Sequence, residues 1–251
     1  MHRFHLPPEE MTGSVLTLRG REAHHGLRVL RLRRGETVTT LDGAGTACRC
    51  EVSELARDSI ALTVQERSVT ERLPYQITLV QAIPKGKLFD SIIQKGTELG
   101  VHRIIPLLSE RVITQLDDEK AEGKVEHWRA TAIEAIKQSG SAWLPQIENP
   151  VTPRTLLARC DKHDLPLIAS LQSGSRHPRG WFREFENVNG HRPANACVWV
   201  GPEGDFSREE TSMIIEAGAR PVTLGNQVLR CETAAIYCLS VLNYEFQSTV
   251  P

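Results

Sequence analysis

From residue 75 onward, apolar strand-like segments and helical segments alternate along the chain, and this alternation constrains the fold more than any other feature. Apolar runs typical of strands buried on both faces stand at 76–83, 103–108, 165–171, 196–200 and 221–224. Helices are expected between them near 85–99, 122–139, 179–186, 207–218 and 231–246, with a short one opened by Thr152-Pro153. The pattern predicts an α/β domain over 73–251, with helices on both faces of a parallel sheet.

The first 72 residues follow a different pattern. Short strands are expected at 14–18, 35–41, 46–52 and 59–64, and Asp42-Gly43-Ala44-Gly45 has the composition of a hairpin turn. One helix is expected near 22–32, and the segment 69–74 is predicted to be a linker. Short strands, a tight turn and one helix predict a small β-barrel domain at 1–72.

Charge excludes a uniformly basic nucleic-acid binder, because 30 Lys+Arg stand against 31 Asp+Glu, for a net charge of -1. A local basic patch remains compatible with this balance. Residues 1–72 contain eleven Arg and no Lys, and six of those Arg lie within 19–34. This skew indicates that any affinity for an anionic partner is concentrated in one short segment.

Targeting and metal signals are missing. The opening MHRFHLPPEE lacks the apolar core of a secretory signal, and no apolar run approaches the ~20 residues of a membrane helix. The six cysteines include no C-x-x-C pair, and His24 and His25 have no partner ligands in sequence, so no metal site is expected. We expect a cytoplasmic protein with buried thiols and no membrane partner.

Three expected strand ends carry loops of the kind that bind ligands in an open parallel sheet, at 169–174, 200–207 and 224–233. The second loop has two glycines around a Pro-Glu pair, which lets the backbone approach a ligand closely. Taken alone, this G-x-x-G is more typical of a plain strand-to-helix turn. No G-x-G-x-x-G follows a strand and no G-x-x-x-x-G-K-[ST] occurs, so the signals of dinucleotide and triphosphate sites are missing.

Five motifs occur in one order along the chain: H-H-G-L-R-V-L-R-L-R-R-G-E (24–36), Q-K-G-T-E-L-G-V (94–101), E-A-I-K-Q-S-G (134–140), G-P-E-G-D-F-S-R-E-E (201–210) and L-G-N-Q-V-L-R-C-E-T-A-A (224–235). Together they resemble the SPOUT methyltransferases, and more narrowly the family that methylates N3 of a uridine in 16S ribosomal RNA. Asp205, Cys231 and Ser141 depart from that family, which usually has Gly, often Thr and commonly Arg at these positions.

The resemblance implies a deep trefoil knot in the C-terminal third and a PUA-like RNA-binding domain at 1–72. It implies S-adenosyl-L-methionine as cofactor, S-adenosyl-L-homocysteine as product, an obligate homodimer, and 16S rRNA of the small ribosomal subunit, not DNA, as partner. The implied cofactor-binding residues are Ala169, Ser170, Leu171, Val200, Gly201, Pro202, Glu203, Gly204, Leu224, Gly225, Val228, Leu229, Arg230, Thr233 and Ala234.

For catalysis we expect Arg230 to stabilise the developing uracil anion or to hold a phosphate. Glu203 and Glu232 are candidate proton acceptors. Each also has a structural alternative: Glu203 as a carboxylate that bonds to loop amides, and Glu232 as a favourable charge at the start of a helix. Thr233 is a candidate catalytic residue or only a cap. No proton acceptor is required if the site selects the ionised base.

For RNA we expect Arg21, His24, Arg28 and Arg31 to share one helix face by their three-four-three spacing. The alternative is a solvated face paired with Glu22 or Glu36. The full expected set is Arg3, Arg21, His24, Arg28, Arg31, Arg33, Lys85, Lys87 and Lys95.

Three other functions stay open at this point. One is a different SPOUT reaction such as ribose 2′-O-methylation, and another is a non-catalytic RNA-binding factor in ribosome assembly. A flavodoxin-like or Rossmann enzyme is disfavoured by the missing phosphate-binding glycines.

Overall fold

The computed structural model describes residues 1–111, 118–170 and 174–248. The chain divides into two compact units. The first unit comprises Met1–Arg72 and Ile133–Leu144, and the second comprises Leu73–Ala132 and Pro145–Pro251. Ile133–Leu144 thus belongs to the first unit, although it lies within the domain expected over 73–251. The assignment of separate functions to 1–72 and 73–251 stays a prediction.

The first unit contains a five-stranded sheet of order β1-β3-β4-β5-β2. Its strands are β1 (His2–His5), β2 (Val15–Arg19), β3 (Thr37–Leu41), β4 (Thr46–Leu55) and β5 (Ser59–Val69), with a short 3-10 turn η1 (Pro8–Glu10) after β1. All pairs are antiparallel except β1 with β3. The Asp42 carboxylate closes the predicted hairpin turn, accepting hydrogen bonds from the Ala44 and Thr46 N–H groups at 2.7 and 2.8 Å.

The helix of the first unit is shorter than expected. It consists of α1 (Gly20–His24) and one π-helical turn, η2 (His25–Val29). Arg31 then adopts a left-handed backbone with φ of 54°, and this turn directs Leu32 into the buried core. The expectation that Arg31 shares a helix face with Arg28 is therefore wrong, because the helix ends before it.

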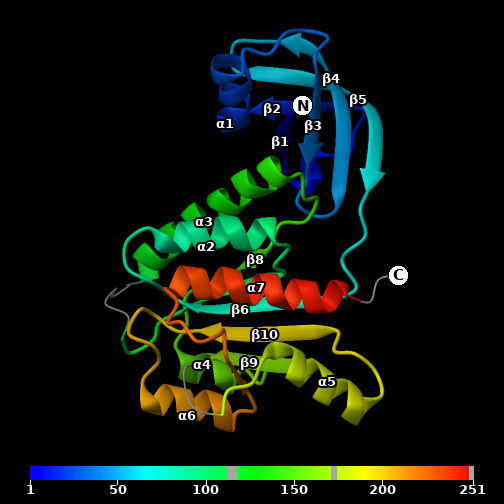
Figure 1. Cartoon of the computed structure of the whole chain (residues 1–251). Coiled ribbons are helices and arrows are strands. Elements are labelled where there is room, and N and C mark those ends of the chain that lie inside the picture. The colour runs from blue at the N-terminus through cyan, green and yellow to red at the C-terminus, as the bar shows by residue number, and fades with distance from the viewer. Residues whose placement is uncertain (112–117, 171–173, 249–251) are drawn as a thin grey trace. The chain divides into compact units, whose positions relative to one another are not determined.

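The second unit is built on a six-stranded sheet of order β11-β9-β10-β6-β7-β8 (Figure 1). The strands are β6 (Gln76–Ala82), β7 (Arg103–Leu107), β8 (Gln146–Ile147), β9 (Leu165–Ala169), β10 (Asn195–Val200) and β11 (Arg220–Val222). Every neighbouring pair is parallel, which confirms the predicted α/β architecture. All their carboxyl ends consequently meet at one edge.

Helices cover both faces of this sheet. They are α2 (Leu88–Glu98), α4 (Pro153–Ala158), α5 (Pro178–Asn189), α6 (Arg208–Glu216) and α7 (Cys231–Gln247). α3 (Asp118–Ser139) instead packs against α2, with the ring centroids of Phe89 and Trp128 4.5 Å apart, and its residues from Ile133 on belong to the first unit. Figure 1 shows α2 and α7 on one side of β6 and β10, with α4 and α6 on the other. Leu156 of α4 and Ile214 of α6 pack on the face that carries Trp199. None of the described helices is both long enough and apolar enough to cross a bilayer.

Candidate active site

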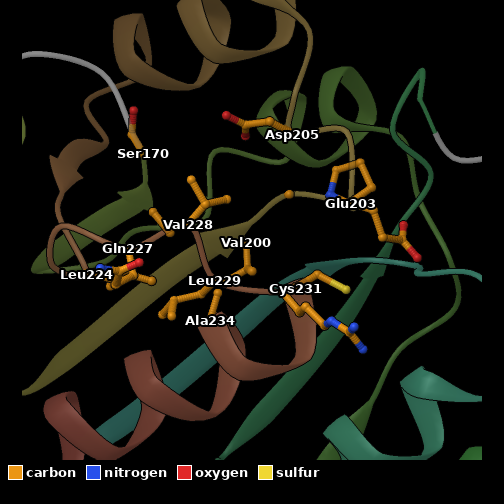
Figure 2. A pocket seen from close by; sticks show the side chains of 14 residues that line it. Ser170, Val200, Glu203, Asp205, Leu224, Gln227, Val228, Leu229, Cys231 and Ala234 are labelled. Carbon is orange, nitrogen blue, oxygen red and sulfur yellow. The ribbon is translucent and has the colours of Figure 1, made fainter.

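The carboxyl ends of β9 and β10 and the loop after β11 surround a cavity of about 290 Å³ (Figure 2). The start of α7 closes it. All three expected ligand loops therefore reach one place, at the sheet edge where parallel strands bind ligands. The lining residues are Ala169, Ser170, Val200, Gly201, Pro202, Glu203, Asp205, Leu224, Gln227, Val228, Leu229, Arg230, Cys231 and Ala234.

Most of the cofactor residues expected from the motifs line this cavity, with four exceptions. Gly204 and Gly225 belong to the same loops without lining it, and Leu171 lies outside the described residues. Thr233 lines a separate groove beside α7. The expected set omitted Gln227, Cys231 and Asp205, although all three stand within the quoted motifs.

The lining is mainly apolar, with few polar groups. Val200 and Ala234 are buried, whereas the Val228 side chain is 78% exposed. In Figure 2, Ser170, Leu224 and Gln227 lie on one side of the cavity and Glu203 on the other. A cavity of apolar side chains and glycine-containing backbone suits a flat ring whose edges need hydrogen bonds from main-chain groups.

The turn that follows β10 depends on two backbone positions. A Cβ added to Gly201 would lie 3.0 Å from Asp205 Oδ1 and 3.1 Å from the Phe206 nitrogen, so no larger residue fits without a shift. Asp205 has φ of 59°, and its Oδ1 accepts a hydrogen bond from the Phe206 N–H at 2.8 Å. Asp205 thus adopts the left-handed conformation that a glycine would readily adopt.

Two glutamates tie this turn to the neighbouring loops. Glu203 Oε1 accepts from the backbone N–H of Lys85, after β6, at 3.0 Å. Glu210 is buried and forms the predicted capping box with Ser207. The Glu210 carboxylate also accepts from the Ser109 hydroxyl and the Glu110 N–H after β7, both at 2.9 Å. The bond to Lys85 agrees with the structural reading of Glu203.

The fourth side of the cavity is the beginning of α7. Arg230 is exposed at the N-cap position, where no side chain of the described residues caps the helix. Cys231 is buried, and its thiol donates to Glu232 Oε2 at 3.4 Å. Burial, followed by the hydrogen bond to Glu232 and the negative charges of Glu203 and Glu232, raises the pKa of the Cys231 thiol to about 12. The thiol therefore stays protonated at neutral pH and is no nucleophile.

The expected RNA-binding residues of the first unit fall into two groups. His24, Arg28, Arg31 and Arg33 are exposed, and the three arginines form no ion pair with any described residue. Arg3 instead donates to the carbonyls of Lys137 and Gln138, at 3.0 and 2.8 Å, where it caps the end of α3.

The acidic residues expected to pair with these arginines have other partners in the structure. Arg21 lies 3.9 Å from Glu134, within the same unit. Glu22, a candidate partner for the arginines, pairs instead with Lys137 at 2.9 Å. Glu36 accepts from the backbone N–H of Arg33, not from its guanidinium. The contacts therefore do not support the alternative, in which Glu22 or Glu36 pairs with the arginines of this face.

The lysines expected from the second unit also differ among themselves. Lys85 and Lys87 are exposed in the segment between β6 and α2. Lys95 lies within α2 and is paired with Glu98 at 2.9 Å. An ion pair with a neighbouring carboxylate reduces what Lys95 offers to an anionic partner.

A family model described as an RNA methyltransferase domain matches residues 71–243. The chain belongs to this RNA methyltransferase family. A second model, described as an RNA methyltransferase PUA domain, matches residues 18–65. The family resemblance expected from the motifs is thus confirmed, as is a PUA-like N-terminal region.

Relatives within the RNA methyltransferase family match over nearly the whole chain. The ribosomal RNA small subunit methyltransferase E of Bacillus subtilis is 30% identical, covering 92% of this chain and 90% of its own. The structure of a Legionella pneumophila methyltransferase with bound S-adenosylmethionine is 31% identical, with a TM-score of 0.85 over 98% of this chain and 96% of its own. A ribosomal RNA small subunit methyltransferase E from Neisseria gonorrhoeae, bound to the same cofactor, is 30% identical, with a TM-score of 0.83 over 99% and 97%.

Proposed function

We propose that this protein transfers a methyl group from S-adenosyl-L-methionine to N3 of a specific uridine in 16S rRNA of the small ribosomal subunit, with S-adenosyl-L-homocysteine as product. The observation that carries the proposal is the single cavity lined by both the G-P-E-G and the L-G-N-Q-V-L-R loops. Family membership and the relatives named above support the same reaction.

The lining of the cavity fits the cofactor. Its apolar walls suit the adenine ring and the methylene groups of the methionine chain, and its loops offer main-chain groups to the ring edges. Ser170 and Gln227 add polar side chains at one side. When bound, S-adenosylmethionine supplies an electrophilic methyl group on its sulfonium.

The residues at the start of α7 act on the uracil. N3 of uridine carries a proton that must leave, and it lies on the Watson–Crick edge, so the base has to be unpaired or extruded. Arg230 places a guanidinium at the cavity, where it stabilises negative charge that develops on the uracil oxygens. Glu232, two residues further on, is the candidate acceptor for the N3 proton.

The exposed arginines of the first unit contact rRNA phosphates. Arg28, Arg31 and Arg33 lie within six residues of one another and have no described ion-pair partner. Guanidinium forks suit phosphate oxygens, and each contact releases counterions, so binding weakens as salt rises. Replacing Arg28 and Arg31 together is expected to reduce the salt slope of binding.

We further propose a cytoplasmic homodimer with a knotted C-terminal region. Support for the dimer comes from the outer face of α7, where Tyr237 is 39% and Tyr244 is 63% exposed. These tyrosines line a groove of about 620 Å³ together with Ile236 and Val241. Sedimentation velocity of a Val241→Asp variant checks this, because a charge within a dimer interface is expected to give monomers.

One labelling experiment tests the reaction. The protein is incubated with labelled S-adenosylmethionine and unmodified small ribosomal subunits, and the modified nucleoside is identified after digestion of the RNA. Label in 3-methyluridine is the expected result. Label in a 2′-O-methyl nucleoside would indicate the ribose reaction, and cofactor binding without transfer would indicate a non-catalytic assembly factor.

A further inference from the structure

We propose that Glu203 is a positioning residue, whose carboxylate orders the segment of residues 84–87 so that Lys85 and Lys87 meet phosphates of the target RNA strand. This inference rests on the proposed function. It assigns to Glu203 a role in RNA binding through Lys85, in place of the role of proton acceptor.

The bond that carries the inference joins two loops at the same sheet edge. β6 and β10 are neighbours in the sheet, with Gln81 opposite Val200, so the loops that follow them start side by side. Glu203 Oε1 accepts from the Lys85 backbone N–H at 3.0 Å, across 118 positions of sequence. Because the donor is the main chain, the ammonium group of Lys85 stays available to another partner.

The segment of residues 84–87 needs a contact from another part of the chain to hold it in place. Gly86 has φ of 66°, and no atom of the described residues lies within 4 Å of where its Cβ would be, so its own packing does not hold it. At its far end, the Lys87 carbonyl accepts from the Asp90 N–H at 3.2 Å, at the start of α2. At its near end Pro84 is buried, and the bond to Glu203 adds a fixed point at Lys85, before Gly86.

Ordering this segment matters because both lysines are exposed and have long side chains with many rotamers. Lys85 and Lys87 form no ion pair with any described residue. A lysine ordered before binding loses less conformational freedom when it meets a phosphate, so the fixed segment binds more tightly than a free one. Glu203 lines the cavity itself, which places this cationic segment beside the reacting base.

Proline substitution isolates the backbone bond. Lys85→Ala removes the ammonium group and keeps the N–H, whereas Lys85→Pro removes both. We expect Lys85→Pro to bind unmodified small ribosomal subunits about fivefold more weakly than Lys85→Ala, the size of one hydrogen bond. In a Glu203→Ala background, the two variants should bind equally. A difference of the same size in both backgrounds would overturn the proposal.

Glu203→Gln separates positioning from proton transfer. The amide keeps an oxygen that accepts from Lys85, so RNA affinity should recover to within about twofold of wild type, whereas Glu203→Ala stays about fivefold weaker. Weak binding by both variants contradicts positioning. A second result would also contradict the proposal: a Glu203→Gln variant that binds RNA as wild type does but has a kcat about a hundredfold lower, and whose kcat no longer increases with pH. That result would indicate that Glu203 accepts the proton. Since the affinities are measured without methyl transfer, they stay informative even if the proposed reaction fails.

Discussion

The two loops that face each other across the cavity differ in how they are held. The loop after β10 is tied through Glu203 to Lys85 and through Glu210 to Ser109. The loop at 224–230 is held mainly at its ends in the part of the chain that the structure describes, by Gly225 N–H to Thr223 Oγ1 and by the first bond of α7. One wall is therefore preformed, and the other is free to adapt to its ligand.

The largest effect is expected at the end of the less constrained loop. Arg230→Ala should lower kcat by about 10²- to 10³-fold, because the charge that stabilises the uracil anion is lost. Arg230→Lys is the matched control, which keeps the charge without the planar fork and should recover part of the rate. Single-turnover methyl transfer to small subunits measures both. Full activity of Arg230→Ala with unchanged RNA affinity would remove the assignment.

In the preformed wall, the loop after β10, we expect substitutions to lower the free energy of unfolding. Glu210→Ala removes one helix cap and leaves the Ser109 hydroxyl and the Glu110 N–H without their acceptor. We expect a loss of about 2–4 kcal/mol in the free energy of unfolding, measured in urea. Glu209→Ala is the control, because Glu209 is exposed in the same helix turn. Equal losses in both variants would show that the wall is not held by Glu210.

The dependence of stability on alkaline pH tests whether Cys231, at the start of α7, stays shielded from solvent. The pKa of the Cys231 thiol is raised from its ordinary value of 9.0 to about 12, so its stabilising contribution is complete below pH 9 and is lost as pH rises toward 12. Between pH 8 and 10.5, wild type should therefore lose about 1–2 kcal/mol more stability than Cys231→Thr. Equal losses would mean that the thiol is reached by solvent and that the adaptable wall opens in the free protein.

The smallest effect is expected from Asp205→Gly. Glycine adopts the left-handed backbone without strain, while the bond from Phe206 N–H to Asp205 Oδ1 is lost, so the two changes offset one another. Unfolding free energy should change by less than about 1 kcal/mol. Asp205→Val is the contrasting variant, because a β-branched residue is strained at this φ and should destabilise the turn more. A stabilised valine variant would contradict this account.

Patterns of burial made much of the fold predictable. Apolar runs marked five of the six strands of the second unit, all but the two-residue β8, and the Ser207–Glu210 spacing marked the start of α6, since both signals are local. β1 was missed because four residues with one buried side chain carry no periodicity, and it forms only by pairing with β3. The bond of Glu203 to Lys85 joins distant parts of the chain, and no pattern in sequence encodes such a partner.

The difference between local contacts and contacts across the sequence also affects the order in which the bonds of Glu210 form during folding. Its bond to the Ser207 N–H closes a loop of a few residues and can form as α6 nucleates. Its bonds to Ser109 and Glu110 span 101 and 100 positions, so they form only after β10 and β7 have joined the sheet through β6. The cofactor wall thus becomes rigid late in folding, and a chain still being assembled does not yet offer a complete site.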